Sequence, residues 1–488
     1  MNCFELFAGC GGLGYGFHQN NFKIVVANEL DEKIAKTYRE NFPDTNVIVG
    51  DITKQEVKDK VYDSFKNISC DVILGGPPCV AYSMSGHRNS RDPRGQLFRD
   101  YVDFVKNLKP KAFVMENVKG ILTIKHDKEN LTESEKELAD KYYALEEEKL
   151  KILAKKKLLS TKNKKPTSIP VVKNKKALKE VNKKLKKMKD MIPEFRMNVT
   201  DIIKNTFKDL GYNVKMKLLN SANYGVPQKR ERVIFIGLRN DIDKEIVYPE
   251  ETHNKEGTDG KLKWVSVREA IDDLKDKEED KDIQQIYTQH RGDFIEKIKN
   301  TEIGTSVLKK YSEAFYRCYP DRPSNTVKEN HGGVFVHYEK NRVMTPRELA
   351  RLQSFPDDFI FKGTKSSMLI QLGNAVPCGL SKAIAKEIKQ KHEQMFYPTV
   401  RVRAKKAGGS GTVVYSEKHN GEYYTYVITN HHVVSNCISL EKKWDPVIKR
   451  KVDKEVLDTV SVEFFRYNNY SHTIGSFAVE ADIVAYSE

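Results

Sequence analysis

One cysteine stands where a reactive thiol would be useful. Cys79 follows Pro77 and a second proline in the stretch DVILGGPPCVAYSMSGHR (71–88), just past an apolar run typical of a buried strand. The prolines stiffen the turn that presents the thiol, and the end of such a strand faces the crevice where open α/β sheets bind ligands. Glu116 ends the next apolar run, in VMENV. A thiolate beside a carboxylic acid suggests covalent attack with proton donation, and a buried inert cysteine is the ordinary alternative.

A glycine-rich turn near the start of the chain indicates a second ligand. Glycines at positions 9, 11, 12 and 14 follow the first apolar run and let the backbone approach a ligand closely. Glu29 closes the next strand pattern, where a carboxylate can accept hydrogen bonds from ribose hydroxyls, and Asp51 adds a carboxylate after the third. No Gly-Lys-Ser/Thr follows the glycines, which argues against a phosphate-binding P-loop. The turn therefore predicts a nucleoside-containing cofactor.

Short β-rich runs alternate with helical patterns over the first half of the chain. Such alternation predicts an α/β fold with a doubly wound sheet, whose carboxyl edge would gather the residues named above. The runs lie at 3–8, 23–29, 45–53, 70–76, 111–117 and 232–238.

The composition indicates a folded, multi-domain protein with an acidic partner. The chain has 488 residues, 39% of them hydrophobic, and a net charge of +16 that indicates a polyanion as the partner, with nucleic acid as one candidate. Seven cysteines show no paired spacing for a disulfide framework or a zinc site, so we expect no metal. The sequence shows neither a signal-peptide pattern nor an apolar stretch of about 20 residues, so we expect no membrane association and a cytoplasmic location.

The composition changes abruptly between residues 121 and 196. Two lysine-rich segments with apolar residues at three- and four-residue spacings flank the breaker KNKKPTSIP, which predicts an inserted helical hairpin. Two interpretations stay open: a charged hairpin that is only solvated, or a lysine-bearing arm that touches a phosphate backbone.

Six motifs in order carry a family resemblance over roughly residues 1–395. The chain resembles the cytosine-5 DNA methyltransferases, which implies a mixed, Rossmann-like sheet, S-adenosylmethionine as cofactor and double-stranded DNA as substrate. The motifs are FELFAGCGGLGYGF, GGPPCVAYS, VMENVKG, NYGVPQKRERVIFIG, MTPRELARLQSFPDDF and IQLGNAVP.

The resemblance implies a role for each catalytic candidate. Cys79 would add to carbon 6 of cytosine, so that carbon 5 becomes nucleophilic enough to take a methyl group. Glu116 would hydrogen-bond ring nitrogen 3 and the exocyclic amine. Arg232 would hold the cytosine carbonyl oxygen, and Arg230 would help position the cysteine loop. Because none of these groups can reach a stacked base, the base would be flipped out of the duplex.

The resemblance also implies a cofactor pocket built from both ends of the catalytic region. One departure is visible in the cysteine loop, where Val80, Ala81 and Tyr82 replace the usual glutamine, small residue and phenylalanine. This departure leaves the chemistry intact but puts in doubt how the loop fills the gap left by the flipped base. The expected cofactor-binding residues are Phe7, Gly9, Gly11, Glu29, Asp51, Ile52, Pro77, Asn374 and Val376.

The segment that reads DNA sequence should precede the motif MTPREL. A family-typical helix is expected at 264–274, which leaves 276–340 as a small recognition domain. The resemblance implies duplex DNA as the partner; we expect a monomer associated with the nucleoid, and a cognate restriction or defence partner that fits a restriction-modification role. The DNA-binding candidates are Ser83, Arg291, Arg317 and Arg322.

The tail, residues 399–488, raises a separate question. Its GGSGTVV, ITNHHVVSN and ADIVAYSE segments resemble the first barrel of trypsin-like serine proteases, in which His432 and Asp482 would match the base and the acid. The chain stops at Glu488 before a serine nucleophile, so we expect no protease activity from it. A truncated chain, a docking module and an unrelated small β module stay open.

Two rival functions also stay open: a relative that methylates transfer RNA, and a methyltransferase-shaped binding protein without turnover. The expected domains are a catalytic domain at 1–120 and 197–275, a lysine-rich helical insertion at 121–196, a recognition domain at 276–340, a return to the catalytic domain at 341–398 and a protease-like segment at 399–488.

Overall fold

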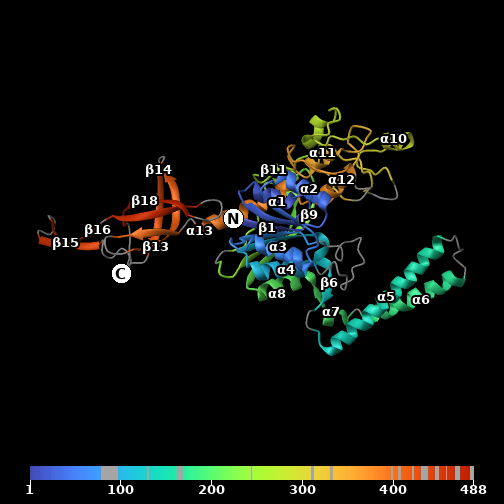
Figure 1. Ribbon diagram of the computed structural model, residues 1–488, viewed down its shortest axis with the longest axis horizontal. Helices are drawn as coiled ribbons and strands as arrows, with labels where there is room; N and C mark the ends of the chain where they lie inside the picture. Colours follow the sequence, from blue (N-terminus) through green and yellow to red (C-terminus); the bar gives the residue numbers. More distant parts are fainter. Residues whose placement is uncertain are drawn as a thin grey trace.

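A seven-stranded sheet organises the first half of the molecule (Figure 1). In the computed structural model its strand order is β3-β2-β1-β4-β5-β9-β8, with the first five strands parallel and β9 antiparallel to both of its neighbours. The expected doubly wound mixed α/β sheet is therefore confirmed. The strands are β1 (Asn2–Leu6), β2 (Lys23–Glu29), β3 (Asn46–Val49), β4 (Val72–Gly75), β5 (Ala112–Val118), β8 (Tyr212–Asn220) and β9 (Glu231–Arg239).

The structure describes most of the chain with several gaps. The described ranges are 1–77, 97–128, 131–161, 169–188, 190–242, 245–308, 313–329, 334–396, 399–404, 408–419, 422–429, 438–445, 450–457, 459–467 and 473–483.

Two layers of helices cover the sheet because strand residues alternate between its faces. In β1, Cys3 packs toward α1 and α13, whereas Phe4 packs toward α3, α4 and α8 on the other face. Both side chains are fully buried. The helices of these layers are α1 (Gly12–His18), α2 (Glu32–Asn41), α3 (Gln55–Ser64), α4 (Leu97–Leu108), α8 (Val199–Asp209) and α13 (Cys378–Phe396).

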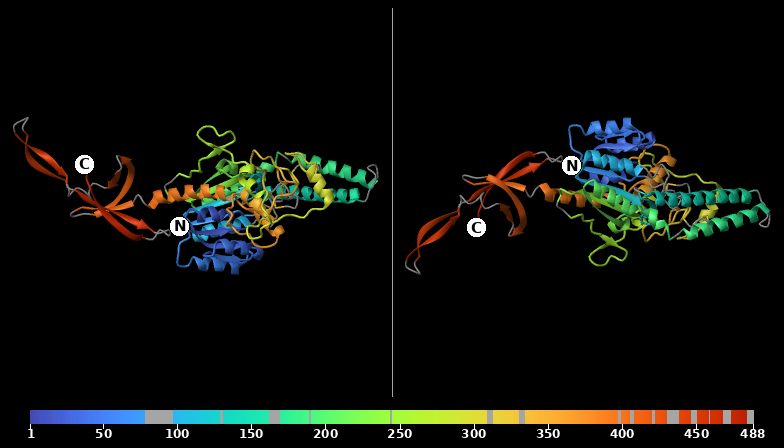
Figure 2. Two further views of the ribbon diagram at one scale, coloured as in Figure 1. Left: turned by 90° about the horizontal axis from the view of Figure 1, so that it is seen from above. Right: turned by 90° about the horizontal axis from the view of Figure 1, so that it is seen from below.

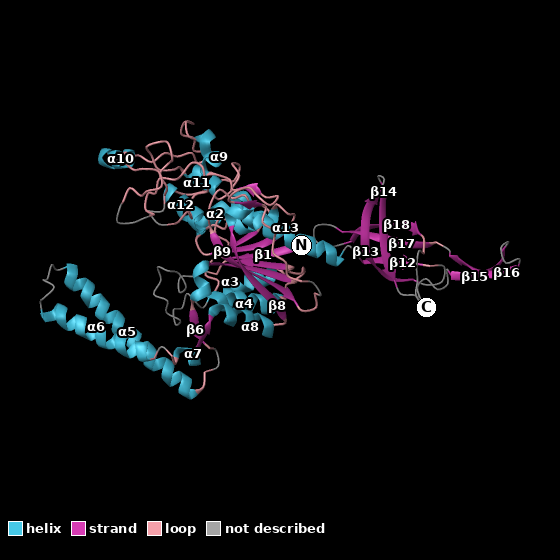
Figure 3. Ribbon diagram, turned by 180° about the vertical axis from the view of Figure 1, so that it is seen from behind, coloured by secondary structure: helices cyan, strands magenta, loops and turns pink. Residues whose placement is uncertain are grey.

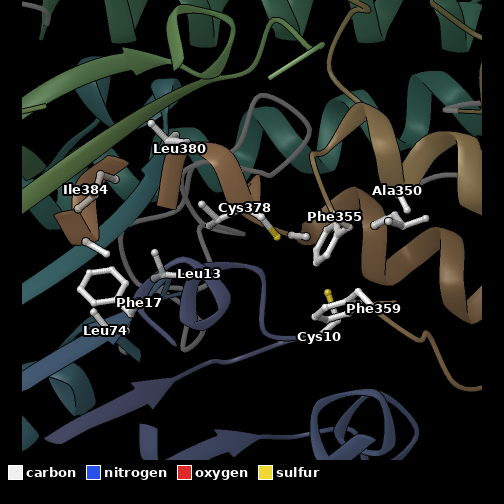
Figure 4. Close-up of a cluster of buried hydrophobic side chains, with 14 of the residues drawn as sticks. Cys10, Leu13, Phe17, Leu74, Ala350, Phe355, Phe359, Cys378, Leu380 and Ile384 are labelled. Atoms are coloured by element: carbon white, nitrogen blue, oxygen red, sulfur yellow. The ribbon is translucent and has the colours of Figure 1, made fainter. Parts of the chain in front are cut away.

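The late helix α13 closes the same core that the first residues open. Figure 4 shows Cys378, Leu380 and Ile384 of α13 facing Leu13 and Phe17 of α1. The hydroxyl of Ser381 donates to the Leu13 carbonyl, which joins the two helices across most of the chain length. The two ends of the catalytic region thus form one folded unit.

A helical hairpin leaves the sheet between β5 and α8. The short helix η2 (Lys119–Thr123) and the ribbon of β6 (Lys125–Asp127) with β7 (Arg196–Asn198) form its root. The long helices α5 (Glu133–Thr161) and α6 (Ile169–Lys187) then run side by side, as Figures 1 and 2 show, and α7 (Ile192–Phe195) follows. The structure therefore contains the two helices expected for the insertion.

The region between β9 and α13 is largely loop, as the pink ribbon in Figure 3 shows. The capping box of Ser266 and Glu269 begins α9, inside the stretch expected to be helical. The boundaries of a recognition domain stay a prediction. The elements here are β10 (His253–Asn254), β11 (Leu262–Lys263), α9 (Val267–Ile271), η4 (Asp272–Leu274), α10 (Gly292–Lys299), α11 (Pro346–Leu352) and α12 (Lys365–Asn374); η3 (Ser221–Tyr224) lies between β8 and β9.

The tail forms an antiparallel five-stranded sheet in the order β14-β13-β12-β17-β18, together with a separate hairpin, β15–β16. Its described buried apolar cluster is small, with Val402, Val460 and Val462 at its centre. None of the described helices of the chain is long and apolar enough to cross a membrane. The tail strands are β12 (Thr399–Arg403), β13 (Gly408–His419), β14 (Glu422–Thr429), β15 (Ile438–Asp445), β16 (Arg450–Leu457), β17 (Val460–Tyr467) and β18 (Thr473–Ala481).

Candidate active site

A carboxylate and a guanidinium meet at the carboxyl end of β5. Glu116 of β5 lies opposite Ile234 of β9, and Arg232 lies opposite Val118, so the two charged side chains share one face of the sheet as diagonal neighbours. Arg232 Nε lies 2.7 Å from Glu116 Oε1, and the side chains are only 12% and 13% exposed. The carboxyl edge of the sheet thus holds a nearly buried ion pair on β5 and β9, one strand beyond the β1–β4 pair at which strand order reverses.

Arg230 is buried just before β9 and ties distant segments together. Its guanidinium donates to the carbonyls of Val327 at 3.0 Å and Gly373 at 2.9 Å. Burial lowers the pKa of Arg230, and the nearby Arg232 lowers it further. Arg230 Nε is buried without a hydrogen-bond partner among the described residues. Arg230 therefore holds Val327, within the expected recognition domain, and the end of α12 against the catalytic sheet.

The start of the cysteine loop passes directly over this carboxylate. The Asn117 amide donates to the Pro77 carbonyl at 3.4 Å. A Cβ placed on Gly76 would lie 3.0 Å from Glu116 Oε2, so only a glycine leaves the carboxylate undisturbed there. Cys79 and Ser83 themselves lie outside the described residues. The described part of the loop nevertheless fixes its point of departure at Glu116.

The glycine turn after β1 rests on two carboxylates, the half-buried Glu29 and the buried Glu5. The amide of Gly9, which has a φ of 57°, donates to Glu29 Oε2 at 2.8 Å. The amide of Gly14 donates to Glu5 Oε1 at 2.8 Å, and the Tyr38 hydroxyl donates to Glu5 Oε2 at 2.5 Å. Burial raises the pKa of Glu5 to about 7, although both of these hydrogen bonds oppose the rise. The turn is thus held by the carboxyl group of Glu5, which has no cationic partner among the described residues.

Sequence reasoning missed Glu5 and its partner Tyr38. The available signal was an acidic residue between apolar neighbours in CFEL (3–6), since a charged side chain in a buried strand needs a specific partner. A Cβ on Gly14 would collide with the Glu5 carboxylate, so the glycine is required for this contact.

The ends of β2 and β3 provide polar groups beside an open space. Burial raises the pKa of Glu29 at the end of β2. Asp51, after β3, accepts hydrogen bonds from Thr53, and these bonds lower its pKa. A Cβ on Gly9 would meet nothing within 4 Å, and the neighbouring Leu30 is 69% exposed although apolar. Leu30 is a second residue that the sequence did not single out.

The remaining cofactor candidates adjoin the glycine turn. Phe7 adopts a φ of 55°, unusual for a residue other than glycine, and Gly11 one of 95°. Ile52 is 3% exposed. Asn374 does not point freely into the crevice, because its amide donates to Glu329 Oε2 at 2.8 Å. Val376 follows it closely, and a Cβ on Gly12 would collide with the Val376 carbonyl, so the late segment abuts the turn.

The three arginines expected to contact DNA differ in what they can reach. Arg317 is 5% exposed and donates to the carbonyls of His337 at 3.1 Å and Ile298 at 2.7 Å, so its guanidinium serves the fold. The expectation that Arg317 contacts DNA was therefore wrong, because its side chain is buried in the protein. Arg322 is 51% exposed, with its guanidinium 3.7 Å from the centre of the Tyr319 ring. Arg291, which precedes α10, is exposed.

The protease-like pair in the tail is only half described. Asp482 is exposed just after β18, and His432 lies outside the described residues. Their juxtaposition stays a prediction.

Comparisons with known proteins agree on one family for most of the chain. A family model described as C-5 cytosine-specific DNA methylase matches residues 1–156 and 173–390. The type II methyltransferase M.DdeI of Desulfomicrobium norvegicum is 31% identical over 443 residues, which cover 80% of this chain and 88% of that protein. The type II methyltransferase M1.HphI of Haemophilus parahaemolyticus is 31% identical over 399 residues, covering 79% and 85% respectively.

A solved structure shares the fold. The crystal structure of a prophage-encoded DNA modification methyltransferase from E. coli aligns with a TM-score of 0.54 at 21% identity, covering 80% of this chain and 99% of that one. This chain and that protein therefore share the arrangement of the sheet and its helices.

Proposed function

The chain belongs to the C-5 cytosine-specific DNA methylase family, and we propose which of its residues carry out each step in the transfer of a methyl group from S-adenosylmethionine to carbon 5 of a cytosine in DNA. The observation that carries the proposal is the nearly buried pair of Glu116 and Arg232 at 2.7 Å, beneath the start of the Pro-Pro-Cys loop. The family match favours DNA over transfer RNA as the substrate.

Cys79 is the nucleophile in this proposal. Five of the seven cysteines, at positions 3, 10, 70, 318 and 378, are buried, and burial raises the pKa of each thiol. A thiol that stays protonated in a core is inert. Of the remaining two, Cys437 lies beyond the residues that match the family, whereas Cys79 follows Pro77, whose carbonyl the Glu-Asn-Val strand holds.

Glu116 and Arg232 would recognise the base and stabilise it as charge develops. When the thiolate adds to carbon 6, negative charge moves onto the ring, and a carboxyl group at ring nitrogen 3 donates a hydrogen bond that stabilises it. Arg232 neutralises Glu116 in the structure. On entry of cytosine the guanidinium would shift toward the carbonyl oxygen of the base, which frees the carboxyl group to take a proton. Because this pair is nearly buried at the sheet edge, the base must be flipped out of the duplex to reach it.

Arg230 would act as a positioning residue. Its guanidinium links the carbonyls of Val327 and Gly373 to the catalytic sheet, and its buried Nε, which has no hydrogen-bond partner among the described residues, would bind the cysteine loop. Loss of this link would disturb the alignment of the loop and the recognition region with Glu116.

The enzyme uses S-adenosylmethionine, which supplies an electrophilic methyl group when bound. The residues around the glycine turn fit this cofactor: the space beside Gly9 is open, Glu29 offers a carboxylate for ribose hydroxyls, and the exposed Leu30 offers an apolar surface to a base. Asp51 and the buried Ile52 would hold the adenine edge. The rest of the pocket would be lined by Phe7, Gly11, Pro77 and Val376. Asn374 would also border the pocket, with its amide held by Glu329.

Specific duplex sequences are the proposed target, in a restriction-modification setting. This setting is the one in the names of the relatives, which are type II methyltransferases. Exposed Arg291 and Arg322, with Ser83, would contact the DNA. We propose that the enzyme acts as a cytoplasmic monomer on nucleoid DNA, beside a cognate nuclease or defence partner. The tail is assigned no activity, and its likeness to a protease barrel stays a hypothesis.

The test combines site mapping with covalent trapping. Bisulfite sequencing of host DNA after expression should reveal cytosines methylated in one short sequence. A duplex carrying 5-fluorocytosine at that site should form a denaturation-resistant adduct, because fluorine at carbon 5 blocks the elimination that releases Cys79. Cys79→Ser should lose both methylation and adduct while duplex binding persists, since an alcohol is a much weaker nucleophile than a thiolate.

The matched control is Cys437→Ser, which should keep both the adduct and the methylation. Undiminished turnover by Cys79→Ser, or an adduct that depends on Cys437, would overturn the assignment of the nucleophile.

A further inference from the structure

The helical insertion carries most of the net charge of the chain. Residues 121–196 contain 22 lysines and arginines against 12 acidic residues, a net charge of +10 out of the +16 of the whole sequence. The charge is unevenly divided between the two long helices: α5 has seven lysines and seven acidic residues, whereas α6 has eight lysines and one glutamate. The excess therefore sits on α6 and not along the whole hairpin.

The lysines of α5 and α6 also differ in their partners. Along α5, Lys136 pairs with Glu133 at 2.7 Å and Lys151 pairs with Glu147 at 2.7 Å. For the described side chains of α6 the structure shows no ion pair with any acidic residue. All of the following described lysines of α6 are exposed: Lys175, Lys176, Lys179, Lys183, Lys184, Lys186 and Lys187.

The helical period turns these lysines outward. Val181 is 2% exposed and lies on the side of α6 that packs on α5, where Ile152 is 8% exposed. Lys175, Lys179 and Lys183 are spaced four residues apart, so they align on one face of the helix. We call the seven exposed lysines of α6, together with exposed Lys155 near the outer end of α5, the basic face.

The root of the hairpin is packed and lies close to the active site. The ribbon of β6 and β7 begins only a few residues after Glu116 in the chain. Phe195 is fully buried there and lies 5.8 Å, ring to ring, from Tyr142, over which Arg196 also stacks. The Tyr143 hydroxyl donates to Asp127 of β6. These contacts fix the direction in which the hairpin leaves the sheet.

That direction is shared with the recognition region. Figures 1 and 2 show the hairpin and the region around α10 to α12 projecting from the same end of the molecule, and the C-terminal sheet from the opposite end. The parallel strands run from the N-terminus toward the hairpin end, so the carboxyl edge with Glu116 faces the same way. A duplex held at Glu116 therefore passes on the side where the hairpin extends.

We infer that the basic face binds the phosphate backbone of the duplex that flanks the target cytosine, without reading its sequence. The inference rests on the proposed function, since it requires DNA at the carboxyl edge. Helix α5, with 29 residues, is about 43 Å long, which equals the rise of about 13 base pairs. Flexible lysines suit this task because an ammonium group approaches phosphate as a point charge and needs no fixed geometry.

The experiment compares two variants with equal changes in charge. The test variant replaces Lys175, Lys176, Lys179 and Lys183 with glutamine, which preserves helix propensity. The control replaces the ion-paired lysines of α5 with glutamine, namely Lys136, Lys141, Lys149 and Lys151. Circular dichroism should show equal helix content for both variants and the unchanged protein.

Binding is measured against salt on two duplexes, with about 6 or about 20 base pairs on each side of the target, so that only the longer one reaches the outer hairpin. On the longer duplex the test variant should flatten the plot of log affinity against log salt by about 0.9 per lost contact, and weaken binding about fivefold per contact at 0.15 M salt. On the shorter duplex the test variant should have the same affinity and salt dependence as the unchanged protein. The control variant should have the same affinity and salt dependence as the unchanged protein on both duplexes.

Each other outcome overturns the inference. Equal losses in test and control would mean that net charge alone attracts DNA, and no loss would mean that the hairpin is a solvated surface. A changed methylation sequence would mean that the hairpin reads bases. Failure of the proposed function is seen separately, because it would appear as no methyl transfer by the unchanged protein on either duplex.

Discussion

Two ion pairs in this enzyme have the same length and different surroundings. Arg232 and Glu116 lie 2.7 Å apart with their side chains 12% and 13% exposed. Lys151 and Glu147 of the hairpin are also 2.7 Å apart, with side chains 69% and 66% exposed. Distance alone therefore says nothing about what each pair contributes, because water screens the second pair and not the first.

The difference shows where fixed geometry is useful. A nearly buried pair at the sheet edge keeps two charged groups in one orientation without the reorganisation that water would need, which suits a site that must meet a developing charge. Exposed lysines on a helix keep their freedom, which suits contacts with a repeating, uniform backbone. The same comparison predicts effects of very different size when single charges are removed.

The largest effect should follow from Glu116→Gln. The amide keeps the shape but cannot donate a proton to the ring, so kcat should fall by about 10²- to 10⁴-fold, the range typical of general acid catalysis. Binding of duplex DNA should change little, because the pair lies at the base pocket and not along the backbone. Single-turnover methyl transfer at saturating DNA measures the effect, with separate binding titrations.

A hairpin variant provides the contrast for this measurement. Glu147→Gln changes the same atoms in an exposed setting and should leave kcat within about twofold, as expected for a surface substitution. If the two variants lost activity equally, the distinction between the buried and the exposed pair would be wrong.

The sequence predicted the strand-end residues well because their positions depend on local pattern. Glu116 and Glu29 each close an apolar run, and the end of a parallel strand lies at the ligand edge whatever the rest of the chain does. The same reasoning does not reveal that Glu116 meets Arg232, since that contact depends on the register between β5 and β9. Register is set by turns and packing across more than a hundred residues of chain.

Burial decided the cases that sequence reasoning missed. Arg317 and Arg322 look alike in the sequence, yet one is 5% exposed and hydrogen-bonded to carbonyls while the other stacks on Tyr319 at the surface. The sequence signal at Glu5, an acidic residue in an apolar run, does not reveal its partners, because Gly14 and Tyr38 come from two different helices. Such contacts exist only after the layers pack together.

An intermediate effect should follow from Glu5, a buried carboxyl group with neutral partners. Its pKa of about 7, above the ordinary 4.5, means that the folded protein keeps a proton which the unfolded chain has already released. Stability should therefore fall as pH rises from about 4.5 to 7, by a total of about 3 kcal/mol, and then level off. Glu5→Gln should remove this slope from urea unfolding measured between pH 5 and 8.

The control for this slope is Glu56→Gln, an exposed glutamate in the first turn of α3, which should leave the pH dependence of unfolding unchanged. A slope that survives in Glu5→Gln would show that other groups produce it. A slope of the opposite sign in the unchanged protein would mean that Glu5 is ionised in the folded state.

The smallest effect should come from the exposed pair itself. Replacing Lys151, Glu147 or both with glutamine should shift the melting temperature by about 1 °C or less, because exposed i,i+4 pairs are weak and screened by salt. The shift in melting temperature of the double variant should equal the sum of the shifts of the two single variants within that margin, and added salt should remove any coupling between them.

The matching double-mutant cycle on Arg232→Met and Glu116→Gln should be strongly non-additive and insensitive to salt, because each single variant leaves a nearly buried group without its partner. If salt erased the coupling of both pairs alike, water would reach Glu116 as freely as Glu147, and the sheet edge could not provide the dry setting that the proposed chemistry requires.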